Sequence, residues 1–120
     1  MKVTVKITDN FKKEVKSLLK KYASLKTDLK NLEKELIENP KSGTSLGNNS
    51  FKVRLKINSK GKGKSGGARV ITLLETDVIA TIVNSESETI VNLITIYDKS
   101  ATENISDKEL KRLLLHFKNE

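Results

Sequence analysis

The stretch FKVRLKIN, residues 51–58, is the feature that most restricts how this chain can fold. Apolar residues occupy every second position, and Lys52, Arg54 and Lys56 stand between them. Because successive side chains of a strand point to opposite faces of its sheet, this pattern predicts a strand with one buried face and one cationic face. The buried face should consist of Phe51, Val53, Leu55 and Ile57.

A lysine- and glycine-rich stretch, SKGKGKSGGAR at residues 59–69, joins this strand to a second β-like run, ARVITLLE at residues 68–75. A mere linker is disfavoured, because the stretch connects two strands of one predicted sheet. It also departs from the phosphate loop of nucleotide-binding enzymes, G-x-x-x-x-G-K-[ST]. Residues 63–65 match the last three positions of that motif, but Asn58 stands where its first glycine is required, and a strand rather than a helix follows. The stretch is therefore interpreted as a positively charged loop.

The net charge of +8 is concentrated in one segment of the chain. Residues 39–74 hold eight of the 23 basic residues and no acidic residue, so the rest of the chain carries 15 basic and 15 acidic residues. Such a concentrated field suits a polyanionic partner such as nucleic acid, whereas an ordinary solvated basic face stays open as the alternative. The eight are Lys41, Lys52, Arg54, Lys56, Lys60, Lys62, Lys64 and Arg69.

The N-terminal third predicts a strand followed by two helices. Residues 3–7 alternate between apolar and polar side chains, as in a short strand. Apolar stripes with helical spacing follow at residues 11–22 and 25–36, and the short join between them predicts an antiparallel helical hairpin. The second helix should end at Asn39, because the residue before a proline disfavours the α region. Residues 41–50 are polar and contain glycine, which predicts a loop.

The C-terminal part predicts further strands and a last helix. Residues 78–83 and 89–97 are rich in β-branched side chains, which is typical of strands. The S-x-x-E capping pattern at residues 106–109 begins a helix with an apolar stripe. The whole of residues 1–120 is therefore expected to be a single α+β domain. An N-terminal strand and a helical hairpin would pack on a twisted, mainly antiparallel sheet, with a C-terminal helix.

Composition limits the chemistry that the chain can perform. There is no cysteine, which excludes thiolate metal sites, and the single histidine, His116, cannot form a His–His acid/base pair. No cluster of His, Asp and Glu has metal-ligand spacing, so neither a metal nor another cofactor is expected. Lysine and arginine can still bind phosphates, offset charge on a pentavalent phosphorane and, where the lysine pKa is lowered, transfer protons. RNA supplies its own nucleophile, the 2′-hydroxyl, so a cluster of such residues could cleave it.

Candidate residues for this chemistry can be placed on the predicted sheet. Tyr97 and Lys99 share one parity with Val91, Leu93 and Thr95, so all five are expected on one face of the last strand. If that strand lies close to residues 51–58, the basic side chains of both converge on one groove with the loop along its rim. Plain alternatives stay open, namely a half-buried sheet tyrosine for Tyr97 and solvated surface for the lysines. The candidate catalytic residues are Lys52, Arg54, Arg69, Tyr97 and Lys99, and the candidate nucleic-acid-binding residues are Lys56, Lys60, Lys62 and Lys64.

The motifs FKVRL, SKGKGKSGGARVI and LITIYDKS resemble the RelE/HigB-type toxins of bacterial toxin–antitoxin systems, part of the RelE/ParE superfamily. The resemblance covers residues 1 to 115 and includes the expected order of strands and helices. It implies a ribosome-dependent endoribonuclease that cleaves the mRNA codon in the ribosomal A site by metal-independent 2′-hydroxyl attack. It also implies a cognate antitoxin as partner, for which the C-terminal helix is one candidate docking region.

The resemblance implies roles for the candidate residues, with two departures. The span from Arg69 to Lys99 is longer than in compact members, which predicts an extended hairpin, and a tyrosine position differs. Better-studied members carry a tyrosine shortly after the basic residue that closes the last strand, whereas this chain has Ile105 there. Tyr97 is then the candidate for a related role. The other implied roles are phosphate binding and proton transfer for Lys52 and Arg54, transition-state stabilisation for Arg69, and the closing basic position for Lys99.

Two other functions stay open. A ParE-type toxin acts on DNA gyrase through protein contacts and has the same fold, so the fold alone cannot decide. A basic module for single-stranded RNA is the other, although three Phe and two Tyr provide few surfaces for base stacking. No apolar run approaches the ~20 residues that span a bilayer, and the N-terminus lacks the pattern of a signal peptide. The expected location is therefore the cytoplasm, with no membrane partner.

Overall fold

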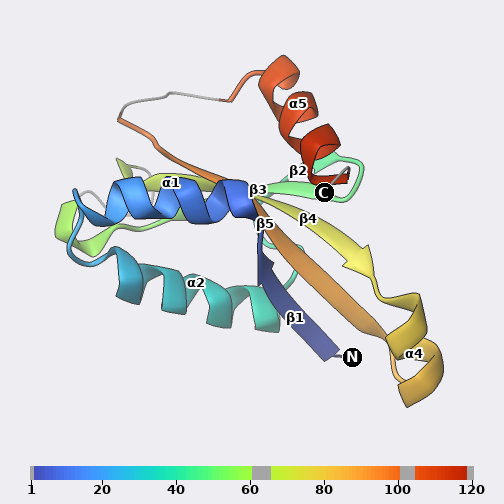
Figure 1. Ribbon diagram of the computed structural model, residues 1–120. Coiled ribbons are helices and arrows are strands. Elements are labelled where there is room, and N and C mark those ends of the chain that lie inside the picture. Colours follow the sequence, from blue (N-terminus) through green and yellow to red (C-terminus); the bar gives the residue numbers. More distant parts are fainter. Residues whose placement is uncertain (1, 61–65, 101–104, 119–120) are drawn as a thin grey trace.

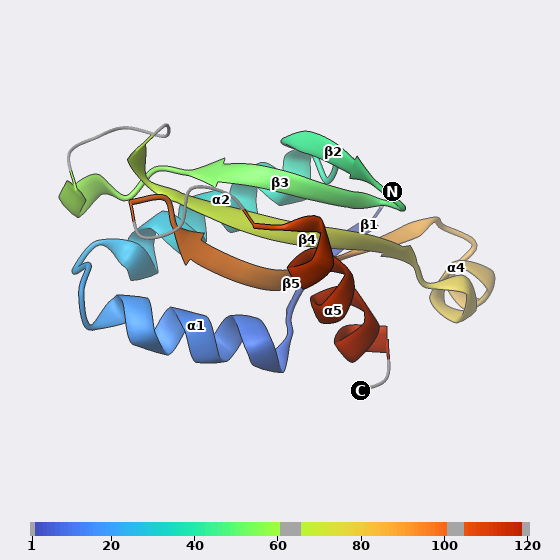
Figure 2. The ribbon, with the colours of Figure 1, turned by 90° about the horizontal axis from the view of Figure 1, so that it is seen from above.

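The computed structural model describes residues 2–60, 66–100 and 105–118, and the fold is given for these residues. They form one five-stranded sheet in the order β1-β5-β4-β3-β2, with helices on both of its faces (Figures 1 and 2). The strands are β1 (Lys2–Ile7), β2 (Thr44–Gly47), β3 (Ser50–Leu55), β4 (Ala68–Thr76) and β5 (Glu88–Asp98). The helices are α1 (Asp9–Leu19), α2 (Leu25–Glu38), α4 (Val78–Asn84) and α5 (Asp107–Lys118), with a 3₁₀ turn η1 (Asn58–Lys60).

The sheet is mixed, because β1 runs parallel to β5 while every other neighbouring pair is antiparallel. The expected α+β class and mainly antiparallel sheet are thus confirmed for the described residues. The helical hairpin of α1 and α2 is also as predicted. Thr8 joins the first strand to this hairpin: its hydroxyl accepts a hydrogen bond from the Phe11 amide at 3.2 Å and donates one to the Leu93 carbonyl at 2.8 Å. The start of α1 is therefore tied to β5.

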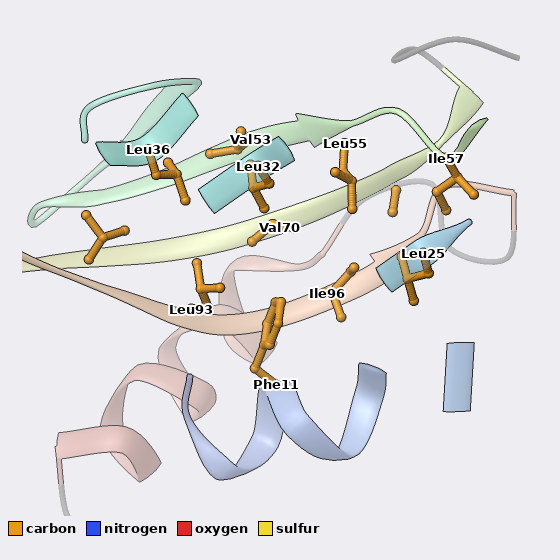
Figure 3. Close-up of a cluster of buried hydrophobic side chains, with 12 residues drawn as sticks. Phe11, Leu25, Leu32, Leu36, Val53, Leu55, Ile57, Val70, Leu93 and Ile96 are labelled. Atoms are coloured by element: carbon orange, nitrogen blue, oxygen red, sulfur yellow. The ribbon is translucent and has the colours of Figure 1, made fainter. Parts of the chain in front are cut away.

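The main core lies between the helical hairpin and one face of the sheet (Figure 3). Phe11 of α1 and Leu25, Leu32 and Leu36 of α2 are buried there, as the apolar stripes predict. Burying such side chains is the main favourable term in folding, at about 1.5–3 kcal/mol each. The sheet contributes Val53, Leu55, Ala68, Val70, Val91, Leu93 and Ile96.

A smaller cluster lies on the other face of the sheet, under α5. Leu113 of α5 is buried against Ile71, Leu73 and Ile94. The Ser106 hydroxyl caps this helix by accepting a hydrogen bond from the Glu109 amide at 3.1 Å, which matches the predicted helix start. Of the helices in the part of the chain that the structure describes, none is both long and apolar enough to cross a membrane.

The strand predicted at residues 78–83 is wrong: these residues form the helix α4. The Asp77 carboxylate caps it by accepting a hydrogen bond from the Ala80 amide at 2.9 Å, and Ser85 ends it in the left-handed conformation at φ 55°. The β-branched composition suggested a strand, but β-propensity depends on packing against a neighbouring strand. The capping residues decide the conformation of this connection instead.

The loop predicted at residues 41–50 contains the strand β2, which pairs with β3. Asn48 and Asn49 make the tight turn between them, both with positive φ, at 52° and 62°. Asparagine tolerates this left-handed region, which two-residue hairpin turns require. The strand expected over residues 51–58 is also shorter, because β3 ends at Leu55 and η1 follows.

Candidate functional site

Three candidate residues form one row across the sheet. Arg54 of β3 lies opposite Arg69 of β4, and Arg69 lies opposite Tyr97 of β5, so all three share the face that α5 partly covers. Lys52 stands two residues before Arg54 and therefore lies on the same face. Like charges placed directly opposite each other destabilise a sheet. An anion placed between these side chains would offset such repulsion.

Tyr97 belongs to this row because β5 contains a bulge. Thr72 of β4 pairs with Leu93, but the preceding Ile71 pairs with Thr95, so Ile94 is an extra residue. The bulge reverses the alternation of side chains beyond it. The expectation that Leu93 and Tyr97 share a face is therefore wrong: Leu93 packs under the helical hairpin, whereas Tyr97 packs on the α5 side.

Four of the five candidate catalytic residues line one cavity of about 380 Å³. Among the described residues that line it, the carboxylate of Glu35 is the only acidic group, beside four cationic side chains. Glu35 comes from α2 and reaches the cavity along the open edge of β3, where the pairing with β2 stops at Lys52. The four cations are Lys52, Arg54, Arg69 and Lys99.

No sequence pattern distinguishes Glu35 from the other polar residues of its helix, whose apolar stripe already accounts for core packing. Glu35 lies three residues after the buried Leu32, so the helical repeat places it beside the face that packs on the sheet. The carboxylate is only half-buried, so it can take part in proton transfer as well as in ion pairing.

Arg69 is the most firmly held of the four cations. Its residue is 6% exposed, and its guanidinium Nη1 donates a hydrogen bond to the Ala68 carbonyl at 3.1 Å. Arg54, by contrast, is exposed. A buried guanidinium in a fixed place can stabilise developing charge without reorganising, and an exposed one can meet an incoming phosphate.

Two glycines shape the backbone around the cavity. A Cβ atom on Gly43 would lie 2.3 Å from the Lys52 carbonyl oxygen, and Gly43 has a φ of +95°. A Cβ atom on Gly67 would lie 2.0 Å from the Leu55 carbonyl oxygen. The Gly67 carbonyl in turn accepts a hydrogen bond from the Lys99 amide at 3.1 Å, which fixes where Lys99 leaves β5. Close backbone approach therefore sets the positions of two of the cavity's lysines.

Tyr97 lies beside this cavity rather than in its lining, and its ring packs in the cluster under α5. Burial raises the pKa of Tyr97, while the Ile105 backbone and the positive charge of Arg69 oppose this rise. No described residue forms a hydrogen bond of ordinary length and geometry with the buried Tyr97 hydroxyl. The phenol is thus kept neutral next to Arg69.

The four candidate nucleic-acid-binding lysines divide into three cases. Lys56 is exposed and, with Arg54, lines a neighbouring cavity of about 370 Å³. Lys60 is held inside the fold: its side chain is 7% exposed and its ammonium lies 2.7 Å from an Asp98 carboxylate oxygen. In this conformation Lys60 does not present its charge to a ligand. Lys62 and Lys64 lie outside the described residues.

Asp98 is the centre of a buried network that the sequence did not reveal. Besides Lys60, the Tyr22 hydroxyl and both the amide and the hydroxyl of Ser100 donate hydrogen bonds to its carboxylate. Burial opposes ionisation, but the donors outweigh this effect and hold the pKa of Asp98 well below its usual range. Tyr22 comes from the turn after α1, so this network connects the helical hairpin, η1 and the end of β5.

A second buried carboxylate, Asp28 of α2, holds the start of η1. The Ser24 hydroxyl and the Asn58 side-chain amide donate hydrogen bonds to it at 2.7 and 2.6 Å, and the Asn58 backbone amide donates another at 3.2 Å. Two aspartates therefore anchor η1, the last described segment before residue 61. We call Asp28, Asp98 and their donors the anchor network.

Among the described residues, no group of three or more His, Asp and Glu side chains could hold a metal ion. Comparison of the sequence with protein-family models and with curated proteins gave no match. The functional assignment therefore rests on the cationic cavity, its neighbouring tyrosine and the anchor network.

Proposed function

We propose that this protein is a ribosome-dependent endoribonuclease toxin of the RelE/HigB type, with a RelE/ParE-like fold. The observation that carries the proposal is the cavity in which Lys52, Arg54, Arg69 and Lys99 meet the single carboxylate of Glu35. Four cations around about 380 Å³ suit a phosphodiester, and a carboxylate among them supplies a proton acceptor.

In the proposed reaction, the 2′-hydroxyl of a nucleotide attacks the adjacent phosphorus. Glu35 accepts the hydroxyl proton as the new P–O2′ bond forms. Arg69, which the sheet holds in place, stabilises the charge on the phosphoryl oxygens. A lysine ammonium, from Lys52 or Lys99, gives its proton to the departing 5′-oxygen as the P–O5′ bond breaks. The products are a 2′,3′-cyclic phosphate and a free 5′-hydroxyl, and all atoms and protons balance.

The surroundings of the cavity support RNA rather than a protein surface as the target. The exposed Arg54 and Lys56 extend the positive charge from this cavity to its neighbour, which Arg54 also lines. An extended line of cations can follow successive phosphates of a strand. Arg54 and Lys56 belong to the segment of residues 39–74, which has eight basic residues and no acidic one.

Induced expression in bacteria, followed by primer extension on a reporter mRNA, tests the proposal. Growth arrest with cuts inside the translated codons is the expected result, and cutting should disappear when the reporter lacks a ribosome-binding site. Growth arrest without cuts, together with inhibition of supercoiling by purified gyrase, would instead assign the protein to the ParE-type toxins.

A cytoplasmic toxin of this kind needs an antitoxin that blocks its cationic cavity. The antitoxin should carry acidic residues for this cavity, because the described residues that line the cavity provide four cations and one carboxylate. Co-expression with the product of the neighbouring gene tests this part of the proposal. A stable complex that restores growth is expected, and continued arrest despite expression of both proteins would contradict it.

A further inference from the structure

The helix α4 exposes a compact apolar surface. Val78, Ile79, Ile82 and Val83 are between 60% and 74% exposed, and no residue of this helix is buried. Their spacing of three and four residues places them on one side of the helix. Single exposed apolar residues are ordinary on a protein surface, but a contiguous group of this kind marks an interaction site.

The structure holds α4 in place without covering it. Thr81 donates a hydrogen bond to the Asp77 carbonyl at 2.8 Å and accepts one from the Glu88 amide at 3.2 Å, which ties the helix to the start of β5. The Asp77 carboxylate caps its first turn. A seven-residue helix gains little stability from its own hydrogen bonds. Most of the stability of α4 must therefore come from packing against other side chains. A partner that covers the apolar side would supply that packing.

Charge limits which partner can do so. Between Arg69 and Lys99 the chain contains no lysine or arginine, and its acidic residues there are Glu75, Asp77, Glu86, Glu88 and Asp98. Four of these five flank α4 directly. An acidic border repels nucleic acid and anionic lipid surfaces, and it favours an apolar surface edged by cations.

The same protein carries an apolar surface edged by cations, next to the helical hairpin. A groove of about 480 Å³ lies between β1, α1 and α2, within the roughly 300–1,000 Å³ typical of binding pockets. Its walls are mainly apolar, and the exposed Ile7 and Leu19 lie along it. Lys26 and Lys30 stand at its edge, against one carboxylate, Glu33.

A chain cannot insert α4 into its own groove. Both views place α4 beyond the ends of β4 and β5, away from α1 and α2 (Figures 1 and 2). The helix and the groove do not overlap, so one copy can offer α4 while receiving the helix of another. We propose that this protein self-associates by inserting the apolar side of α4 into the β1–α1–α2 groove of a second copy, with Lys26 and Lys30 of that copy facing the acidic border of α4.

Sedimentation equilibrium of the purified protein over a range of concentrations tests this proposal, independently of any nuclease activity. The mean mass should rise above that of one chain with concentration, and the association should weaken with added salt, because the lysine–carboxylate contacts are exposed. A mass of one chain at every concentration up to about 1 mM would overturn the proposal.

Two variants test the apolar side of α4 and the β1–α1–α2 groove one at a time. Ile82→Asp places a charge in the apolar side of α4, and the pair Lys26→Glu with Lys30→Glu reverses the charge at the groove. Each should weaken self-association by about tenfold or more, the size expected for a central interface residue. Leu115→Asp is the matched control, because Leu115 is equally exposed but lies on α5, and it should associate like the wild type.

Mixing the two variants gives the sharpest result. The Ile82→Asp protein keeps an intact groove and the lysine variant keeps an intact α4, so the mixture should associate more strongly than either protein alone. Equal association in the mixture and in the separate variants would overturn the proposal. Thermal unfolding should show that all variants are folded, since every substituted residue is exposed.

Discussion

The cationic cavity and the anchor network both place charged side chains near one end of the sheet, but they balance charge in opposite ways. In the anchor network, the Asp98 carboxylate is 4% exposed and meets an ammonium and three hydroxyl or amide donors. In the cavity, four cations share one carboxylate, and Arg54 and Arg69 lie directly opposite each other. The difference separates charge that links distant parts of the fold from the charge to which we assign the proposed cleavage.

The two regions are also connected. The Lys60 ammonium of the anchor network lies 3.4 Å from the Gly67 carbonyl, which accepts the hydrogen bond from the Lys99 amide of the cavity. The anchor network therefore positions the backbone on which one cavity lysine stands. Substitutions in the first region should act on stability, and substitutions in the second should act on cleavage.

The largest expected effect on stability follows from Asp98→Asn. This change leaves the Lys60 ammonium buried without its carboxylate, which typically costs about 3–5 kcal/mol. Urea denaturation measures the change in the free energy of unfolding. Lys21→Ala is the control: this lysine lies 3.6 Å from Asp98 but is 62% exposed, so its loss should cost less than about 1 kcal/mol. Equal losses for the two variants would contradict a structural role for the buried pair.

The Asp98 contribution should depend on pH. Because the pKa of Asp98 is lower in the folded protein than in the unfolded chain, the unfolded chain binds more protons as the solution becomes acidic. The stabilisation is therefore complete above the ordinary aspartate pKa of about 3.9 and is lost as the pH falls towards the folded value. The difference in stability between wild type and Asp98→Asn should shrink on going from about pH 6 to about pH 3. A constant difference would show that the carboxylate charge is not involved.

The largest expected effect on activity follows from Arg69→Ala. Removing a fixed group that stabilises transition-state charge lowers the rate by roughly 10²–10³-fold. Cleavage of ribosome-bound mRNA by the purified variant measures this loss, and circular dichroism checks the fold. Arg112→Ala is the matched control, because this exposed arginine pairs with Glu109 on α5, away from the cavity, and should leave the rate unchanged. Full cleavage by Arg69→Ala would remove Arg69 from the mechanism.

A moderate effect is expected from Gly67→Ala. The added methyl group would lie 2.0 Å from the Leu55 carbonyl oxygen, so the backbone must shift, at a cost of about 1–3 kcal/mol. Because Gly67 also positions Lys99, cleavage should fall as well. Gly47→Ala provides the comparison: it has open space around it and only the strain of a positive φ, so stability should fall by about 1 kcal/mol with cleavage retained. An equal loss of cleavage in both variants would contradict the positioning role.

The smallest expected effect on stability is that of Tyr97→Phe. The hydroxyl is buried without a hydrogen bond of ordinary geometry to a described residue, so its removal should change the free energy of unfolding by less than about 1 kcal/mol. A loss of cleavage at unchanged stability would assign the hydroxyl a part in the reaction. Unchanged cleavage would support the alternative that Tyr97 is a packing residue of the sheet.

The sequence predicted those features that depend on regular alternation. The buried positions Val53 and Leu55 of β3, the apolar stripes of the hairpin and the cap at Ser106 all follow from local spacing. The predicted closeness of residues 51–58 to the last strand is not found, because β4 lies between β3 and β5. The sequence did not predict the bulge at Ile94, because no residue type marks it, and this bulge decides which face Tyr97 occupies.

The remaining differences come from contacts between distant parts of the chain. Glu35 enters the cavity only because β2 stops short and leaves the edge of β3 open to α2. Lys60 was a candidate for nucleic-acid binding because it lies in a run of lysines, and its burial depends on Asp98, far along the chain. The helix α4 was misread because β-branched residues are common in strands, whereas its capping residues and the absence of a neighbouring strand favour a helix.

The chemistry of the cut ends provides the most decisive measurement. Purified protein is incubated with ribosomes programmed with an mRNA, and with the same mRNA carrying a single 2′-deoxynucleotide at the cut position. The proposed reaction predicts a 5′-hydroxyl on the downstream fragment, which a kinase can label directly, and no cutting of the 2′-deoxy substrate at that position. Cleavage of the 2′-deoxy substrate, or a 5′-phosphate on the fragment, would contradict 2′-hydroxyl attack in the cationic cavity.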